Sequence, residues 1–251
     1  MDYKIYIESL NNFPIADWMV SAYMGFKGKQ ANIVFFEDID EVPVAPWVIL
    51  VAYIETTNKY FEKIGLPPKQ AINVPYQLWK EEFLKREVGN GKMEDITWYS
   101  EQRKWPLFVK PDGKAKEFIA GVVKTPTDAL IYFSKIPQDT KIFYSEVVDF
   151  VSEYRCYIIN GVLKGMKHYL GDPFIAPNKE KVMKMIAAYT EAPSGYSLDV
   201  GVLSTGETVL VECNDGWSLG NYGLDDSIYS NLLATRWREI IKEVKWMKHL
   251  G

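Results

Sequence analysis

Residues 197–215 read SLDVGVLSTGETVLVECND, two apolar segments on either side of a short turn. Apolar runs bounded by turn residues are typical of buried strands. Ser197 to Leu203 and Thr208 to Cys213 are therefore predicted to pair as a hairpin around Gly206. This hairpin determines what we expect of the rest of the chain, because it places polar side chains inside an otherwise apolar sheet.

Three polar residues interrupt the hairpin. Asp199 lies within its first strand, and Glu212 and Asn214 lie two residues apart on its second strand. Side chains two apart on a strand share a face, and pairing brings Asp199 close to them. Carboxylates that face each other unpaired inside a sheet would repel one another and lose hydration. Two carboxylates and a carboxamide are the hard oxygen ligands that Mg²⁺ binds together with phosphate and water, so the pattern favours a metal site.

Two charged segments precede the hairpin, both at the ends of apolar runs. In FVKP, residues 108–111, Lys110 follows an apolar strand, where a buried ammonium requires an anionic partner. Glu146 lies near the end of the next strand, and Glu153 and Arg155 open the one after it, projecting to the same face. Taken singly, these segments are better explained by a solvated lysine and an edge ion pair than by a binding site.

Together, the three segments resemble the ATP-grasp superfamily, and especially its short, stand-alone members. The resemblance covers roughly residues 105–224 and rests on the order and spacing of the segments. The matching text is FVKPDGKAKEF (108–118), YSEVVDFVSEYRCYIINGVLKG (144–165) and YSLDVGVLSTGETVLVECNDGWSLGNYG (196–223). The first hundred residues have a weaker similarity to the α/β domain that usually precedes this fold.

The resemblance implies a set of nucleotide contacts. Lys110 would contact the α- and β-phosphates and the edge of the adenine, and Lys116 would lie on the loop that covers the phosphates. Glu146 and Val148 would form the hinge that recognises the adenine amino group. Glu153 would bind the ribose hydroxyls. ATP is therefore an expected ligand.

The resemblance also implies the groups around the reacting atoms. Asp199, Glu212 and Asn214 would hold the Mg²⁺ ions that bridge the phosphates. Arg155 would face phosphate or the activated substrate, and it is assigned a catalytic role together with the loop lysine, Lys116. Residues 215–222 would form the loop beside the acceptor site.

The chain departs from the usual pattern at two places. Residues 112–116, DGKAK, are rich in lysine where many relatives have a glycine-rich phosphate loop. Many ligases of the superfamily place an arginine two residues before the first metal aspartate, and this chain has Ser197 there. Two alternatives follow: Arg155 substitutes for that arginine, or the reaction differs in detail. Trp217 and Tyr222, in the loop after the hairpin, are equally consistent with a substrate-facing and a structural role.

The pattern of elements predicts a fold of the α/β plus α+β class. The first hundred residues alternate between strand-like and helix-like segments, as in a small, mostly parallel sheet, whereas strands dominate from Trp105 onward. We expect a pre-ATP-grasp α/β domain over residues 1–95 and a two-lobed ATP-grasp domain over residues 105–250. The smaller lobe is expected at about 105–150, and the metal-binding lobe at about 151–250.

Several local predictions accompany this assignment. Gln70 to Val74 is expected to form a strand, and Tyr76 to Val88 a helix whose charged run, Lys80 to Arg86, is its solvated face. Gly89 to Gly91 is expected to open a linker. Ser227 to Leu250 is expected to form one long helix.

Composition limits the classes of function. The 251 residues carry a net charge of −4, which predicts no general attraction to nucleic acid. Cys156 and Cys213 lie in apolar runs and are expected to be buried hydrophobes, as suits a reducing compartment. We identify no signal peptide and no stretch long enough to span a bilayer, so a cytoplasmic location is expected.

The leading hypothesis is an ATP- and Mg²⁺-dependent ligase that releases ADP and joins a carboxylate to an amine through an acyl phosphate. Its substrates would be a small-molecule or peptide carboxylate and an amine. A phosphotransferase that acts on another group is a second possibility, and a non-catalytic ATP-binding module is a third. The complete metal set argues against the third, since a module without turnover need not retain it.

Overall fold

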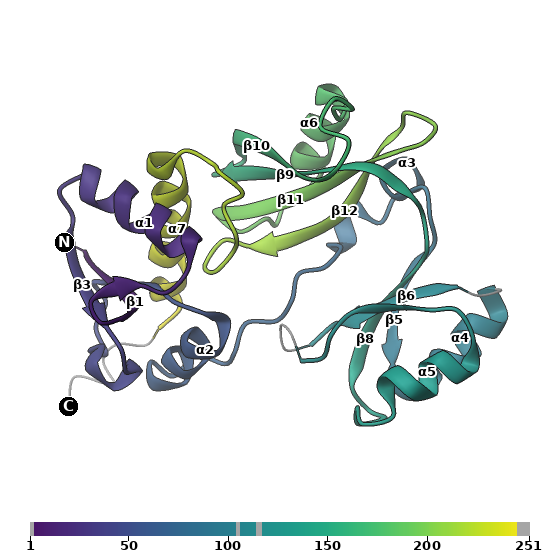
Figure 1. The fold of residues 1–251 in the computed structure, drawn as a ribbon, viewed down its shortest axis with the longest axis horizontal. Helices are drawn as coiled ribbons and strands as arrows, with labels where there is room; N and C mark the ends of the chain where they lie inside the picture. Colours follow the sequence, from purple (N-terminus) through teal and green to yellow (C-terminus); the bar gives the residue numbers. More distant parts are fainter. Residues whose placement is uncertain (1–2, 104–105, 114–116, 245–251) are drawn as a thin grey trace.

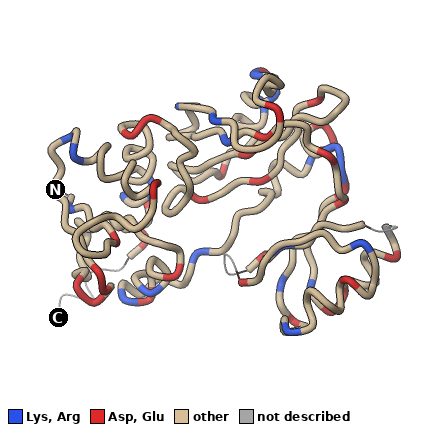
Figure 2. Tube along the Cα trace, viewed as in Figure 1, with Lys and Arg blue, Asp and Glu red and all other residues tan. Residues whose placement is uncertain are grey.

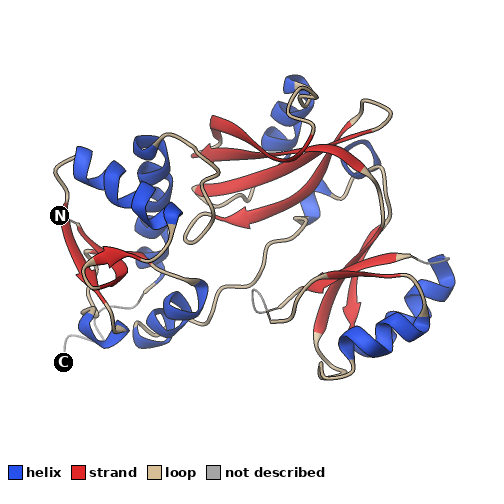
Figure 3. Ribbon diagram, in the orientation of Figure 1, coloured by secondary structure: helices blue, strands red, loops and turns tan. Residues whose placement is uncertain are grey.

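The computed structural model describes residues 3–103, 106–113 and 117–244, which form three units, each containing a four-stranded sheet (Figure 1). Figure 3 shows helices beside each sheet and long loop segments between the units. Lysines and arginines are interspersed with acidic residues over all three units (Figure 2). Among the described residues, no helix combines the length and the apolar character needed to cross a membrane.

The N-terminal unit has a parallel core in the strand order β3–β1–β4, to which β2 adds an antiparallel pairing with β1. The residues of β4 are buried throughout, as expected where a parallel strand is covered on both faces. The strands are β1 Lys4–Leu10, β2 Phe13–Pro14, β3 Asn32–Phe36 and β4 Val48–Val51. The helices are α1 Asp17–Gly28 and α2 Ile54–Lys63, with a 3₁₀ turn at Ile39–Glu41.

The smaller lobe contains an antiparallel sheet in the order β5–β8–β6–β7. Its strands are β5 Val88–Lys92, β6 Leu107–Pro111, β7 Gly121–Val123 and β8 Lys141–Glu146. Its helices are α4 Ile96–Arg103 and α5 Pro126–Phe133, with a 3₁₀ turn at Met93–Asp95. Thr125 caps α5 by accepting a hydrogen bond from the amide of Asp128 at 3.1 Å. The lobe has its own apolar core between the sheet and these helices.

The large sheet is antiparallel throughout, in the order β10–β9–β11–β12. Its strands are β9 Phe150–Ile159, β10 Val162–Gly171, β11 Gly195–Leu203 and β12 Thr208–Asp215. Helix α6, Lys179–Ala188, buries Val182 and Met185 against the face that contains Cys156 and Leu198. The intervening residues of β9 and β11, on the other face, include the polar side chains of the candidate site.

Helix α7, Asp226–Ile240, returns to the N-terminal unit and packs beside α1 (Figure 1). The two helices approach so closely that a Cβ on Gly25 would lie 1.9 Å from the carbonyl oxygen of Asp226. Lys29, after the end of α1, donates a hydrogen bond to Ser230 Oγ at 2.6 Å. Because α7 also contacts β9 and β11, it joins the N-terminal unit to the large sheet.

The helix predicted over Ser227 to Leu250 is confirmed in its first part. It begins beside Asp225, whose side chain accepts hydrogen bonds from the first-turn amides, and it ends at Ile240. A 3₁₀ turn follows at Ile241–Glu243. Residues 245–250 of the predicted helix lie outside the described residues.

The single helix predicted over Tyr76 to Val88 is wrong. A 3₁₀ turn at Tyr76–Leu78 is followed by a one-turn helix, α3, at Glu81–Leu84. Lys85 adopts a left-handed φ of 52°, which cannot continue a right-handed helix. The chain then enters β5, so the apolar residues of this segment belong to three short elements.

The predicted strand at Gln70 to Val74 and the predicted linker at Gly89 to Gly91 are also wrong. The first segment makes only an isolated bridge, from Asn73 to β12. The glycines lie within β5, because a tyrosine ring covers the strand where a side chain would stand. A Cβ on Gly89 would lie 2.4 Å from the hydroxyl oxygen of Tyr144.

The predicted fold class, an α/β unit followed by a two-lobed, strand-rich α+β region, is confirmed. The exact division into residues 1–95 and 105–250 remains a prediction. β5 lies before residue 95 and pairs with β8, and α7 packs against α1, so pairing and packing extend across that division.

Candidate functional site

Two cavities lie on the polar face of the large sheet. The first, which we call the interlobe cavity, has a volume of about 280 Å³ and lies between the smaller lobe and the large sheet. Its lining combines apolar side chains with charged ones: Arg86, Phe108, Lys110, Val122, Phe143, Ser145, Glu146, Val147, Val148, Phe150, Glu153, Val211 and Glu212. The second, which we call the acceptor cavity, lies between the N-terminal unit and the large sheet and has a similar volume, about 280 Å³. It is lined by Trp18, Tyr53, Ile54, Arg155, Asn214, Ser218, Leu219, Gly220 and Tyr222.

A cluster of five polar side chains connects the two cavities. Lys110 Nζ lies 2.6 Å from Glu212 Oε2, and Asn214 Nδ2 lies 2.9 Å from Glu212 Oε1. Arg155 forms a two-pronged ion pair with Asp199, with Nε–Oδ1 and Nη2–Oδ2 distances of 2.8 and 2.6 Å. Asn214 Nδ2 is also 3.4 Å from Asp199 Oδ2. The predicted metal residues and the predicted catalytic arginine therefore meet in one place.

Strand register explains this arrangement. Asp199, on β11, is paired with Arg155 on β9 and with Glu212 on β12. Directly paired residues of antiparallel strands lie on the same face with their Cβ atoms close together. The register changes between Asp199 and Val200, a local irregularity of the kind that often re-aims side chains beside functional sites.

The two carboxylates lie in different electrostatic environments. Burial raises the pKa of Asp199 to about 6, although the hydrogen bonds and charge of Arg155 favour its ionised form. Burial also opposes ionisation of Glu212, but the charge and hydrogen bond of Lys110 outweigh it, so the pKa of Glu212 lies below its usual value. Both groups are thus mainly ionised at neutral pH. With Lys110 and Arg155 they make a formally neutral cluster.

The donor set fits a divalent cation. The oxygen-bearing side chains of Glu212 and Asn214 are within hydrogen-bond distance of each other, and Asp199 is adjacent. Mg²⁺ is commonly bound by one or two carboxylates together with phosphate oxygens and water. Because Arg155 uses both oxygens of Asp199, this aspartate would share its charge between the arginine and a cation. Within the described ranges, no group of three or more histidine, cysteine, aspartate or glutamate residues forms a metal site by itself.

The nucleotide contacts implied by the sequence lie in one cavity. Lys110, Glu146, Val148 and Glu153 all line the interlobe cavity. Lys110 also lies over the ring of Phe143, with Nζ 5.1 Å from its centroid. Their individual roles remain predictions, and Lys116 lies outside the described residues.

Arg86 was not recognised from the sequence, and the interpretation of Lys80 to Arg86 as a solvated helix face is wrong at this residue. Arg86 is buried and lines the interlobe cavity. Its guanidinium donates hydrogen bonds to the carbonyls of Leu210 and Val211 at 2.7 and 3.1 Å. Nothing in the local text KREV distinguishes this arginine from its exposed neighbours, because its partners lie on β12.

The two aromatic residues of the loop after β12 have different environments. Trp217 is buried and packs edge-on against Phe61 in the core, at a centroid distance of 5.4 Å. Tyr222 is 48% exposed and lines the acceptor cavity. The structural interpretation therefore fits Trp217, and a position facing the cavity fits Tyr222.

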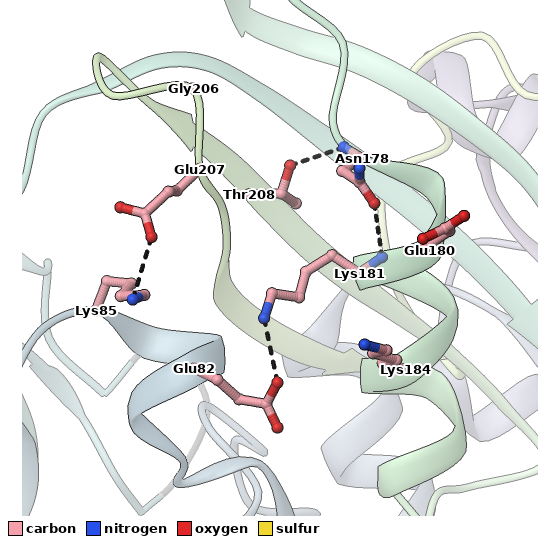
Figure 4. Close-up of a pocket in the computed structure, with 9 residues that line it drawn as sticks. All are labelled: Glu82, Lys85, Asn178, Glu180, Lys181, Lys184, Gly206, Glu207 and Thr208. Atoms are coloured by element: carbon pink, nitrogen blue, oxygen red, sulfur yellow. Dashed lines mark hydrogen bonds and ion pairs between the residues drawn. The ribbon is translucent and has the colours of Figure 1, made fainter.

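A third, strongly charged cavity lies between α3, α6 and the β11–β12 turn (Figure 4). Its charged side chains pair with one another: Lys85 with Glu207 at 3.1 Å and Lys181 with Glu82 at 3.2 Å. Such partly exposed pairs contribute little to stability. The cavity contains none of the predicted site residues, so we do not assign it to the functional site.

Comparison with known proteins gives two kinds of similarity. The first is to a family model described as an ATP-grasp domain, family 2 of its clade, which matches residues 83–232. No curated protein matches the chain.

The second is to solved structures, which match almost the whole chain. D-alanine–D-alanine ligase from Bacillus anthracis has a TM-score of 0.60 and 14% identity, covering 96% of this chain and 98% of that one. D-cycloserine synthetase has a TM-score of 0.62 and 10% identity, covering 93% and 99%. A RimK domain ATP-grasp protein from Sphaerobacter thermophilus has a TM-score of 0.56 and 11% identity, covering 97% and 99%. At these identities the matches establish the fold, and the predicted ATP-grasp architecture is confirmed.

Proposed function

Since the chain belongs to this family of ATP-grasp domains, we propose that it is an ATP- and Mg²⁺-dependent, ADP-forming ligase that joins a carboxylate to an amine. The observation that carries this proposal is the meeting of two cavities at one polar cluster. Lys110 and Glu212 line the interlobe cavity, and Arg155 and Asn214 line the acceptor cavity. A triphosphate in the first cavity and a carboxylate in the second would bring their reacting ends together at this cluster.

The chemistry needs two anions to be held against each other. A carboxylate oxygen attacks the γ-phosphorus and ADP leaves; the amine nitrogen then attacks the acyl carbon, phosphate leaves and the nitrogen loses a proton. Little covalent participation by the protein is needed, so positioning and charge stabilisation dominate. Mg²⁺ held by Glu212, Asn214 and Asp199 would neutralise charge on the phosphates. Lys110 would bind the phosphates from the opposite wall of the cavity.

Arg155 is the residue we assign to the role of the arginine that many relatives have at position 197. Its guanidinium lies directly opposite Asp199 in the sheet and lines the acceptor cavity. Asp199 keeps it fixed and ionised, since the hydrogen bonds and charge of this carboxylate raise the pKa of Arg155 above its usual value despite burial. A fixed cation at this point would stabilise negative charge that develops as the amine attacks the acyl carbon.

Titles of the matched structures support a ligase. The matches include D-alanine–D-alanine ligase and D-cycloserine synthetase, and another structure of the former is described as complexed with ATP. The acid and the amine used by this chain are not determined by that similarity. The acceptor cavity, at about 280 Å³, suits a small-molecule acid or the end of a peptide.

The test is a screen of amino acids, other small carboxylic acids and short peptides with Mg-ATP and hydroxylamine. Hydroxylamine should trap the acyl phosphate as a hydroxamate, with one ADP and one phosphate released per hydroxamate, all measured by mass spectrometry. Glu212→Gln should lower this rate by at least about 100-fold, because it removes a metal ligand. Glu207→Gln is the matched control on the same hairpin and should retain the rate.

The products also separate the alternatives. A stable phosphorylated alcohol or amine without hydroxamate would favour a phosphotransferase. Nucleotide binding with no ADP release for any acid would favour the non-catalytic module. Formation of AMP would contradict the proposal, because the cluster is placed at the phosphate end to prepare the γ-phosphoryl group for transfer.

A further inference from the structure

Tyr169, on β10, contacts the proposed ribose-binding residue from outside the interlobe cavity. Its hydroxyl donates a hydrogen bond to Glu153 Oε2 at 2.6 Å. In the pairing with β9, His168 pairs with Tyr154 and Leu170 with Glu153, so Tyr169 is an extra residue at a β-bulge. Bulges re-aim side chains and are frequent beside functional sites. Burial, together with the charges of Asp199 and Glu153, raises the pKa of Tyr169 above its usual value, so its hydroxyl remains a donor.

The ring of Tyr169 continues the contact towards the acceptor cavity. It stacks on Tyr222, with centroids 5.0 Å apart and an interplanar angle of 20°. The guanidinium carbon of Arg155 lies 4.9 Å from the centroid of the Tyr222 ring. Tyr222 has a left-handed φ of 43°, uncommon for a bulky side chain, so the loop holds it in a strained conformation.

We propose that Tyr169 and Tyr222 form a pair of positioning residues that orients Glu153 for the ribose hydroxyls of ATP and Arg155 for the acid. This inference rests on the proposed function and extends it by assigning two residues that lie outside the metal set and the proposed phosphate contacts.

The pair acts through the atoms that it leaves available. Tyr169 engages Oε2 of Glu153 and fixes the carboxylate, which leaves Oε1 for the ribose. A carboxylate fixed in this way loses less side-chain freedom when it binds a ribose. Tyr222 covers the guanidinium whose Nε and Nη2 are bound by Asp199, so Nη1, 3.4 Å from the carbonyl oxygen of Gly220, is the group left for the acid. One stack thus supports a contact in each cavity.

The first test measures binding of Mg-ATP and of the Mg complex of 2′,3′-dideoxy-ATP by calorimetry, without any acid. Tyr169→Phe should weaken ATP binding by about 3- to 10-fold, the range expected when a hydrogen bond that orients a charged group is lost. It should leave dideoxy-ATP binding unchanged, because that nucleotide has no ribose hydroxyl for Glu153 to bind. Equal weakening of both nucleotides, or of neither, would overturn the pair's role at the ribose.

The second test concerns the ring of Tyr222. Tyr222→Ala should reproduce the ribose-dependent loss and also raise the KM of the acid found in the hydroxamate screen by about 5-fold or more, with less effect on kcat. Tyr222→Phe retains the stack and should rescue both properties. Tyr23→Ala is the matched control, since Tyr23 contacts Phe35 at 5.4 Å and lies under Lys27 at 5.3 Å, in α1.

The outcomes distinguish this inference from the proposed function. If the wild-type protein binds no ATP, the proposed function fails and the pair fails with it. If it binds ATP and forms hydroxamate but Tyr222→Ala behaves like Tyr23→Ala, only the positioning role is overturned. If Tyr222→Phe fails to rescue, the hydroxyl rather than the stacked ring is required, and the inference is wrong.

Discussion

Arg86 brings a positive charge into the wall of the interlobe cavity, where main-chain carbonyls solvate it. Besides the carbonyls of Leu210 and Val211 it binds that of Leu84, at 3.2 Å. Burial lowers the pKa of Arg86 to about 10, while the charge of Glu153 opposes this shift, so the group is protonated at neutral pH. This side chain joins the end of α3 to β12, and thereby fixes the segment that leads into the smaller lobe.

Replacing Arg86 with methionine should lower the free energy of unfolding by about 1–3 kcal/mol, because buried carbonyls lose their donors. Urea unfolding followed by circular dichroism measures the loss. Lys85→Met is the matched control at the preceding residue, whose partly exposed ion pair with Glu207 predicts a change within about 0.5 kcal/mol. An equal effect of the two substitutions would show that the buried contacts of Arg86 are not what stabilises this segment.

Sequence reasoning located some of these residues and missed others for a physical reason. Asp199, Glu212 and Asn214 could be found because each interrupts an apolar strand, and strand periodicity with a short turn determines which residues meet. Arg86 could not be found, since its burial depends on carbonyls more than a hundred residues away. Tyr169 was equally hidden, because a bulge changes the side-chain alternation on which such predictions depend.

At the level of elements, the contact between α1 and α7 is the closest helix approach that the glycines reveal. The space at Gly25 is filled by the first turn of α7, whereas a Cβ on Gly28 would meet nothing within 4 Å. Gly25→Ala should therefore separate the helices and lower the free energy of unfolding by about 1–3 kcal/mol. Gly28→Ala, in the same helix, should cause no loss. Thermal or urea unfolding of both variants tests this, and similar stabilities would contradict the close approach.

Elements with strong local signals were predictable, and those defined by distant partners were not. The strands of the large sheet follow from apolar runs with turns between them, and each was expected close to its observed place. β5 resembled a linker because its glycines are required by overlying rings, Tyr144 on Gly89 and Tyr99 on Gly91. The helix predicted over residues 76–88 had the right apolar content, but Lys85 adopts a left-handed conformation that no local pattern signals.

Across the whole molecule, the interlobe cavity is formed by residues of two separate sheets. Phe108, Lys110 and Phe143 come from the smaller lobe, and Glu153 and Glu212 from the large sheet. The chain passes between the lobes before β5 and again between β8 and β9 (Figure 1). Apart from these crossings, the Lys110–Glu212 ion pair is a direct contact between the lobes. A ligand in the cavity would therefore add contacts that hold the two lobes together.

Mg-ATP should accordingly raise the melting temperature of the protein. At a concentration of 100 times Kd, binding to the folded state adds about 2.7 kcal/mol, which corresponds to a rise of roughly 5–10 °C for a chain of this size. GTP should stabilise less at the same concentration, because the hinge at Glu146 to Val148 is proposed to recognise the adenine amino group, and guanine has a carbonyl there. Differential scanning fluorimetry with ATP, GTP, CTP and UTP, each with Mg²⁺, makes the comparison. Equal stabilisation by all four would contradict the hinge assignment while leaving a phosphate site intact, because the phosphates are common to all four. No stabilisation by any of them would contradict the nucleotide site itself.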